Sequence, residues 1–362
     1  MSQDQVTKEG LRGKRPDREA VPGTMTGRRW QRKRRAEQPM VPKATFSSYY
    51  GKPVLKAPVW KARDIAGYFF LGGLAGGSSL LAAGADLTGR TELGRAAKVG
   101  AGGAITLSFI ALAHDLGRPA RIANMLRVFK VTSPMSVGTW LVGGYAPAAG
   151  LAAASACTGR LPRLGAAATA WTALLAPAVA SYTATLISDT AVPAWHDGYR
   201  EMPFVFTGSA AMAAGGLGLL AAPTAESGPA RNLALAGQVM EMLAFERMTR
   251  RLGMVAEPYH RGRGGAYIRL GQVLGALGAT GAALSPAVPA GRARRVVAAV
   301  SGAALMGASA ATRLGMFHAG VASARDPKYT VVPQRERLNE RGTAKVEPAS
   351  ASVPQPPPVP PA

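Results

Sequence analysis

The chain has 362 residues but only one cysteine, Cys157, and four histidines. A single thiol can form neither an internal disulfide nor a four-cysteine metal site, so we expect no iron–sulfur cluster in this chain. We interpret Cys157 as a small apolar residue of a helix. The histidines, His114, His196, His260 and His318, lie near the ends of apolar segments or between them. This placement argues against a haem held between helices, and the spacing matches no metal-ligand pattern.

Acidic residues are also scarce, with 20 Asp and Glu against 43 Lys and Arg, so the formal net charge is +23. Such an excess, together with the basic run at 28–35, is compatible with nucleic-acid binding. A basic segment ahead of a first membrane span is instead what the positive-inside rule predicts, and it also attracts anionic lipid. Because the middle of the chain is apolar, we expect a lipid membrane as partner and no nucleic acid. No apolar stretch closely follows Arg28-Arg29, so we expect no cleaved signal.

The apolar residues are concentrated in the middle of the chain, although its mean hydropathy is only +0.07. This region is rich in Ala, Gly and Leu, and small residues allow helices to pack closely in lipid. A helix needs about 20 residues to cross the hydrocarbon core. The sequence therefore predicts eight transmembrane helices, near 64–85, 96–115, 134–157, 164–188, 202–222, 230–250, 267–288 and 294–317.

The predicted fold class is an all-α integral membrane protein with two four-helix bundles. We expect a basic disordered or interfacial arm at 1–60, a first bundle at 61–200, a second bundle at 201–320 and a disordered Pro-rich tail at 321–362. Segments with much charge and few apolar residues cannot bury enough surface to fold. The prolines of 353–361 favour an extended polyproline conformation.

The Lys and Arg residues divide unevenly between the two predicted faces of the membrane. The two tails and every second connection carry 34 of them, and the other connections carry 9. The positive-inside rule therefore predicts a cell-membrane protein with both termini in the cytoplasm. The tails dominate this count, in which Arg313 is the first basic residue of the C-terminal tail.

Ionisable and hydroxyl side chains gather at one end of the first four predicted helices. They are Asp64 and Tyr68 in the first helix, His114, Asp115 and Arg118 at the end of the second, and Tyr182 and Asp189 at the end of the fourth. A quinone needs such a set, because its oxygens require hydrogen-bond partners and its reduction takes up two protons. The same residues could instead cap helices and pair with one another, and the spacing leaves both interpretations open.

Glu241 is the exception, because it lies near the middle of the sixth predicted helix. Ionisable residues inside a membrane are costly and therefore mark function by default. A buried glutamate at this depth could be part of a proton path. It could also be a protonated side chain that hydrogen-bonds a neighbouring helix, and the sequence leaves that alternative open.

Several motifs together resemble the NrfD/PsrC family, the membrane subunits of polysulfide-reductase-type enzymes. The run Tyr-Phe-Phe-Leu-Gly-Gly-Leu-Ala-Gly-Gly at 68–77 resembles the family's first helix. The motif His-Asp-Leu-Gly-Arg-Pro at 114–119 and the Ser-Pro-Met-Ser at 133–136 are similar to its signature loop. Ser-Tyr-Thr at 181–183 is similar to the end of its fourth helix. The resemblance covers about 45–320.

The resemblance implies an anchor subunit that binds quinone or quinol, menaquinone or ubiquinone, near one membrane face and carries no redox metal. It implies electron exchange with a four-cluster ferredoxin-like iron–sulfur subunit, which connects to a catalytic subunit, often a molybdopterin enzyme. The family's quinone-contacting positions map onto Asp64, Tyr68 and Tyr182. At the first-helix pair the family often has an amide or a histidine, and Asp64 and Tyr68 depart from that pattern.

From the residues and the resemblance together, we expect Tyr182 and His114 to hydrogen-bond the quinone head. Asp64 and Asp115 are the candidates for proton transfer. Tyr68, Arg118 and Asp189 complete the candidate cofactor-binding set.

Arg121, Arg127 and Lys130 are expected to face the iron–sulfur subunit. Because the basic end is predicted to be cytoplasmic, the partner subunits should lie in the cytoplasm, as in a formate dehydrogenase-like complex. Two other classes stay open. One is a transporter or proton-conducting membrane protein, and the other is a structural membrane anchor without quinone chemistry.

Overall fold

The computed structural model describes residues 5–7, 10–12, 54–56, 58–115 and 124–344. The chain divides into two units, one made of Met1–Val54 with Asp326–Ala362, and one made of Leu55–Arg325. In the first unit, strands β1 (Gln5–Thr7) and β2 (Gly10–Arg12) pair antiparallel, with Val6 opposite Leu11. This unit also contains helix α12 (Lys328–Ala344).

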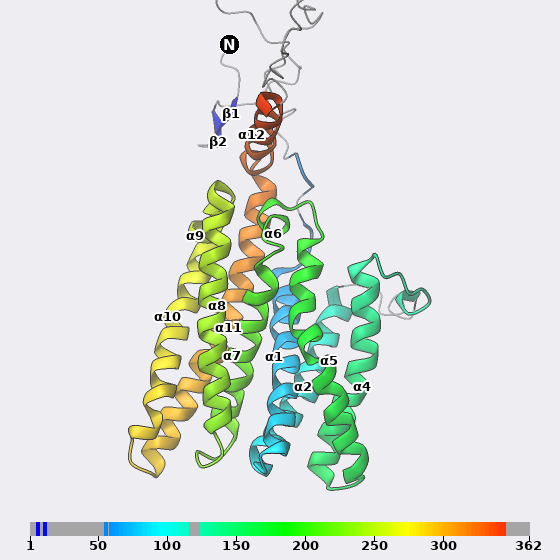
Figure 1. Ribbon diagram of the computed structural model, residues 1–362, viewed down its shortest axis with the longest axis vertical. Helices are drawn as coiled ribbons and strands as arrows, with labels where there is room; N and C mark the ends of the chain where they lie inside the picture. The colour runs from blue at the N-terminus through cyan, green and yellow to red at the C-terminus, as the bar shows by residue number, and fades with distance from the viewer. Residues whose placement is uncertain (1–4, 8–9, 13–53, 57, 116–123, 345–362) are drawn as a thin grey trace, which may run out of the picture. The chain divides into compact units, whose positions relative to one another are not determined.

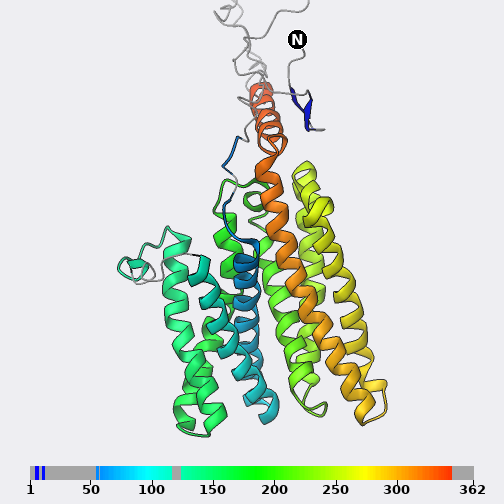
Figure 2. The same cartoon turned by 180° about the vertical axis from the view of Figure 1, so that it is seen from behind.

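The second unit is built from long helices that run side by side (Figures 1 and 2). Its long helices in the described part are α1 (Ala62–Leu87), α2 (Thr91–Asp115), α4 (Pro134–Thr158), α5 (Pro162–Ser188), α7 (Met202–Ala221), α8 (Gly228–Leu252), α10 (Gly262–Leu284) and α11 (Arg292–Arg325). Short helices α6 (Pro193–His196) and α9 (Glu257–His260) and the 3-10 turns η2 (Gly253–Ala256) and η3 (Ser285–Ala287) complete it.

Five of the described helices, α1, α2, α5, α7 and α11, are long and apolar enough to cross a membrane. The chain is therefore a helical membrane protein. The more detailed prediction, eight spans in two four-helix bundles, is not settled by this criterion and stays a prediction.

Each predicted apolar segment falls on one long helix, and the differences lie at the helix ends. Four helices, α4, α5, α7 and α8, have a proline in the first two positions. Proline fixes φ near the helical value and has no N–H to leave unpaired, so it favours the first turn. By contrast, α11 continues to Arg325, beyond the predicted end at 317. Three of its last eight residues are Ala, the strongest helix former, so the helix continues past the predicted end.

The prediction of disorder from residue 321 onward is wrong for 321–325, which belong to α11, and for Lys328–Ala344, which form α12. The prediction rested on the scarcity of apolar residues. Yet α12 contains three Arg and two Glu, which are strong helix formers even where little surface is buried. Within the predicted disordered or interfacial arm at 1–60, the structure has strands β1 and β2, which the sequence did not predict. The remainder of both predicted tails lies largely outside the described residues.

Helix α1 is central to the second unit, because it packs against α2, α5, α7 and α11 (Figure 1). Its glycines allow this. A Cβ added at Gly77 would lie 2.6 Å from the carbonyl oxygen of Ala210 in α7, and one at Gly76 would lie 2.9 Å from that of Ala176 in α5. The glycines therefore serve two neighbours on different sides of α1, which suits close packing of helices in lipid.

The connection between α5 and α7 is fixed by Trp195 of α6. Its side chain is fully buried, and its indole Nε1 donates a hydrogen bond of 2.8 Å to the carbonyl oxygen of Met316. Gly320 leaves room for the ring, which a Cβ at that position would overlap. Trp60 stacks on Trp195 with ring centroids 6.0 Å apart. This aromatic packing holds the segment before α1 against the end of α11.

Candidate functional site

A cavity of about 450 Å³ lies among α1, α2, α4 and α5. Its wall is mostly apolar, as a small-molecule site usually is. The hydroxyl groups in the wall belong to Tyr68, Thr139 and Tyr182. The other lining residues are Phe109, Leu112, Met125, Leu126, Met135, Gly138, Val142, Gly143, Ala146, Pro147 and Leu186.

Two phenols from different helices face this cavity. Tyr68 is buried on α1, and Ser108 of α2 donates a 3.3 Å hydrogen bond to its backbone carbonyl. Tyr182 of α5 lies against Gly138 of α4, where an added Cβ would overlap the phenol ring. Among the described residues, neither phenol hydroxyl has a hydrogen-bond partner. Both hydroxyls are therefore free to bind a guest molecule.

A proline interrupts the helix in the same wall. Pro147 sits inside α4 and lines the cavity together with Gly143. A proline within a helix has no N–H for the carbonyl four residues earlier, so the carbonyl of Gly143 lacks its usual helical donor. The cavity wall thus combines two phenolic hydroxyls with apolar side chains and the proline-interrupted turn of α4.

The structure brings together two of the predicted site residues: His114, predicted to bind the quinone head, and Asp64, predicted to transfer protons. His114 Nδ1 lies 2.9 Å from Asp64 Oδ2. The histidine side chain is 64% exposed and the aspartate side chain 14%, so the pair reaches from solvent toward the start of α1. Asp64 lies one turn before Tyr68 on the same helix. Neither His114 nor Asp64 lines the cavity, so the pair stands beside the cavity and not in its wall.

Two further predicted residues do not line the cavity. Asp115 accepts a long 3.4 Å hydrogen bond from the backbone N–H of Lys61, which joins the end of α2 to the start of α1. Asp189 is exposed at the C-terminal cap of α5. Among the residues that line the cavity, the sequence predicted Tyr68 and Tyr182. It did not predict Gly138 or the apolar side chains.

The predicted docking residues are only partly described. Arg121 lies outside the described residues, as does Arg118 of the candidate cofactor-binding set. Arg127 and Lys130 are exposed in the connection between α2 and α4, which extends to the side of α4 (Figures 1 and 2). Val128 and Phe129 beside them are also exposed, at 66% and 59%. The connection therefore presents basic and apolar side chains together.

A second group of polar side chains is buried between α7, α8 and α11. Thr312 Oγ1 donates a 2.7 Å hydrogen bond to Glu241 Oε1. The neighbouring Arg313 is fully buried; its Nη2 donates a 2.6 Å bond to the carbonyl oxygen of Phe206, and its guanidinium lies 3.8 Å from the centroid of that ring. Glu241 Oε2 and Arg313 Nε and Nη1 have no hydrogen-bond partner among the described protein groups.

Arg313 corrects one step of the sequence interpretation. It was counted among the charges of the C-terminal tail, but it lies within α11 and is buried. Arg313 lies inside the predicted segment 294–317, and this position already indicated that it belongs to a helix and not to the tail. The predicted cytoplasmic total therefore loses one positive charge, which leaves the inferred orientation unchanged. The structure instead places Arg313 as a buried cation near Glu241, which the sequence did not predict.

No group of three or more His, Cys, Asp or Glu side chains gathers into a candidate metal site within the described ranges. Cys157 is exposed near the end of α4. The polar chemistry of the described structure is thus concentrated in the cavity with its adjoining Asp64–His114 pair and in the buried Glu241–Arg313 group.

Long apolar helices around an internal cavity, with ionisable groups buried among them, define a polytopic α-helical membrane protein. The sequence profile of the family described as "Polysulphide reductase, NrfD" matches residues 55–317. The chain belongs to this family, whose members are membrane subunits of oxidoreductase complexes, and the resemblance stated from the motifs is confirmed. No curated protein sequence matches the chain.

Proposed function

We propose that this chain is the membrane anchor that exchanges electrons between a partner iron–sulfur subunit and the quinone or quinol pool. The observation that carries the proposal is the cavity lined by Tyr68 and Tyr182. A quinone head needs donors for its oxygens and an apolar slot for its ring and tail, and this wall supplies both. We further propose that all eight long helices span the membrane as two four-helix bundles.

In this proposal the residues have separate roles. Tyr182 and Tyr68 donate hydrogen bonds to the oxygens of the bound head, and the apolar wall excludes water. Asp64 and His114, which are hydrogen-bonded to each other, pass protons between the solvent and the cavity. A histidine paired with a carboxylate suits this task, because an imidazole ring can both accept and donate a proton. The contact of Asp115 with Lys61 instead holds the ends of α1 and α2 together.

Arg118 and Asp189 remain candidate cofactor-binding residues in the proposal. The bound quinone, menaquinone or ubiquinone, supplies the two-electron chemistry, and the chain supplies binding and protons. The partners are a four-cluster ferredoxin-like iron–sulfur subunit and a molybdopterin subunit, which generally accompany membrane subunits of this family. We place these partners in the cytoplasm, against Arg121, Arg127 and Lys130. Exposed basic and apolar side chains at 127–131 support this docking face.

The test compares quinone-linked turnover of the assembled complex with its turnover on a soluble dye that bypasses this chain. Tyr182→Phe is expected to lower quinone-linked turnover at least tenfold and leave dye turnover unchanged, because only a hydroxyl at the cavity is lost. His114→Ala should slow proton delivery and show the same selectivity, within the 10² to 10⁴ range of positioned acid–base groups. Unchanged quinone-linked turnover by both variants in an assembled complex would refute the quinone site.

The buried Glu241–Thr312–Arg313 group favours a second candidate function, proton conduction. Polar groups without partners inside a membrane protein are costly and mark ion or proton paths. We propose that Glu241 is an element of such a path. In proteoliposomes containing a pH dye, Glu241→Gln should abolish proton movement but leave quinone-linked turnover. If proton movement persists, Glu241 lies outside the path. Solute uptake by liposomes that contain the chain alone would instead favour a transporter.

A further inference from the structure

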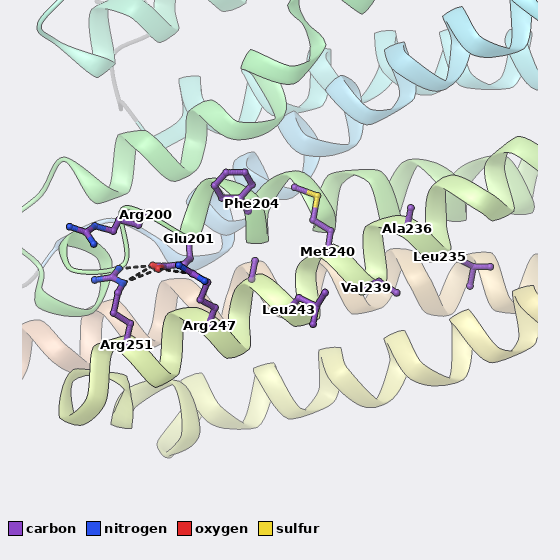
Figure 3. A pocket seen from close by; sticks show the side chains of 11 residues that line it. Arg200, Glu201, Phe204, Leu235, Ala236, Val239, Met240, Leu243, Arg247 and Arg251 are labelled. Carbon is purple, nitrogen blue, oxygen red and sulfur yellow. Dashed lines mark hydrogen bonds and ion pairs between the residues drawn. The ribbon is translucent and has the colours of Figure 1, made fainter.

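A groove of about 900 Å³ runs along α7 and α8, away from the cavity described above. Figure 3 shows its residues: charged side chains cluster at one end, and apolar side chains continue along α8 toward the other. The apolar wall comprises Phe204, Leu235, Ala236, Val239, Met240, Leu243 and Ala244. Several of these are strongly exposed, including Leu243 at 61%. In a membrane, this outward wall meets acyl chains.

The charged end carries three arginines and one glutamate. The Glu201 carboxylate accepts three hydrogen bonds from Arg251. Arg251 Nε donates to both carboxylate oxygens, at 2.8 and 3.0 Å, and Nη2 donates to one of them at 2.5 Å. Arg247 lies 3.8 Å from the same carboxylate, and its side chain is 82% exposed. Arg200 donates through Nε to the Tyr199 hydroxyl at 2.9 Å and is also exposed. The end therefore keeps a net positive charge after its ion pairs are made.

The pKa of Glu201 is lowered by the hydrogen bonds from Arg251, so the carboxylate stays ionised and holds that arginine in place. Arg251 uses its Nε and Nη2 for Glu201 and for the carbonyl oxygen of Asp197, so most of its donors are already engaged. Among the described residues, the terminal guanidinium nitrogens of Arg200 and Arg247 donate no hydrogen bond, although Arg247 Nε lies 3.8 Å from Glu201 Oε1. These exposed groups lie at the mouth of the groove. Guanidinium forks recognise phosphate oxygens with short, charge-assisted hydrogen bonds.

The spacing of the two ends fits one leaflet of a bilayer. Leu235 and Arg247 are twelve residues apart on α8, or about 18 Å at the rise of an α-helix. Half of a typical hydrocarbon core is about 15 Å thick. An acyl chain that follows the groove from the arginines would therefore end near the bilayer midplane, with its phosphate at the arginines.

We propose that this groove binds an anionic glycerophospholipid, with the phosphate between Arg200 and Arg247 and an acyl chain along Val239, Leu243 and Ala244. Charge complementarity selects an anionic headgroup over a zwitterionic one. The predicted orientation places the arginines at the cytoplasmic leaflet, where basic residues attract anionic lipids. The site is separate from the quinone cavity, so this proposal does not depend on quinone chemistry.

The test measures lipid binding by the delipidated full-length chain, using native mass spectrometry in detergent. The probes are phosphatidylglycerol, phosphatidylcholine of the same chain length, and inorganic phosphate. Phosphatidylglycerol is expected to bind at least tenfold more tightly than phosphatidylcholine. The double variant Arg200→Gln/Arg247→Gln should weaken phosphatidylglycerol binding about twenty-five-fold, because each basic residue contributes roughly a factor of five.

Two further variants separate a lipid from a free phosphate. Ala244→Trp fills the groove and should weaken phosphatidylglycerol binding at least tenfold with the arginines intact, and millimolar inorganic phosphate should not displace the lipid. The matched control is Arg163→Gln, which removes an exposed charge at the start of α5 and should leave binding within twofold. Equal binding of both phospholipids, or full binding by Ala244→Trp, would overturn the proposal. Arg247→Lys, which keeps the charge, should fold normally and retain most of the binding.

Discussion

Gly138 determines where the Tyr182 ring can lie, because any larger side chain at position 138 would occupy the space of the phenol. The sequence analysis predicted Tyr182 from its place at the end of a helix, and it matched a known motif. It could not predict Gly138, since a glycine in a Gly-rich membrane helix shows no distinctive signal. Residue types predict chemistry, whereas the contacts that position a side chain depend on the packing of separate helices.

Gly138→Ala should therefore impair quinone-linked turnover through a positional effect. The added methyl group displaces the Tyr182 ring, so the apparent KM for quinone should rise several-fold while dye turnover stays normal. Gly150→Ala on the same helix is the matched control, because nothing lies within 4 Å of its added Cβ. An unchanged quinone KM for Gly138→Ala would show that the Tyr182 position does not matter for binding.

Arg313 is retained at a cost to stability. Two of its guanidinium nitrogens lack partners among the described protein groups, and an unpaired buried polar group costs free energy. Arg313→Met should therefore leave the thermal midpoint unchanged or raise it, while proton movement in proteoliposomes falls. A clear drop in the midpoint of Arg313→Met would mean that the arginine is there for structure.

Thr312→Val, which removes one hydrogen bond to Glu241, should lower the free energy of unfolding by about 0.6 kcal/mol.

The Glu201–Arg251 ion pair predicts a pH dependence. The folded-state pKa of Glu201 is below its ordinary value of 4.5, so its contribution to stability is present above that value and is lost as pH falls through the folded pKa. The midpoint of the wild type should thus decrease on acidification below about pH 4.5, and Glu201→Gln should reduce that decrease. Glu246→Gln serves as control, because its exposed pair with Arg250 contributes little. Parallel curves for wild type and Glu201→Gln would contradict this prediction.

At the scale of elements, the positions of the long helices could be predicted and their partners could not. Apolar runs bounded by charge or proline predict where a helix crosses lipid, which is why the starts of α4, α5 and α7 lie within two residues of expectation. Helix α12 is polar, so a search for apolar runs did not predict it. The sequence also could not predict that the glycines of α1 pack against two different helices. Their contacts with α5 and α7 join residues far apart in the chain.

The glycines of α1 give a matched comparison within one helix. Gly77→Ala places a methyl group 2.6 Å from the Ala210 carbonyl oxygen and 2.8 Å from the Ala214 Cβ, so α1 and α7 must separate. Such overpacking costs about 1–3 kcal/mol, which should appear as a lower thermal midpoint. Gly84→Ala meets nothing within 4 Å and should leave the midpoint unchanged or slightly higher. If both variants behave alike, close packing of α1 is not limiting.

At the scale of the whole molecule, membrane character and family could be predicted, because both depend on composition and on local motifs. The orientation depends on a charge count that the tails dominate, and the described helices do not test it. The pocket end of the first four helices was predicted from the grouping of Asp64, His114 and Tyr182. The groove on α7 and α8 was not, because its arginines were counted as topological charges only.

Cys157 provides a reporter of orientation that needs no engineering. It is exposed near the end of α4, which the predicted topology places outside the cytoplasm. A membrane-impermeant maleimide should therefore label the wild type in intact cells or spheroplasts. In a Cys157→Ser background, Lys130→Cys should react only in inside-out vesicles. The reverse pattern would place the α2–α4 connection, and the proposed partner subunits with it, on the outer face.

The position of α1 has a mechanical consequence. Its Tyr68 forms part of the cavity wall, and about 7.5 Å along the same helix a Cβ at Gly73 would lie 3.1 Å from Arg313 Nη2. One helix thus borders both the cavity lined by Tyr68 and the buried charges. If filling the cavity tilts α1, the tilt moves Gly73 relative to Arg313. By thermodynamic linkage, the ionisation state of Arg313 then changes the affinity of the cavity for its ligand by the same factor as ligand binding changes the ionisation equilibrium of Arg313.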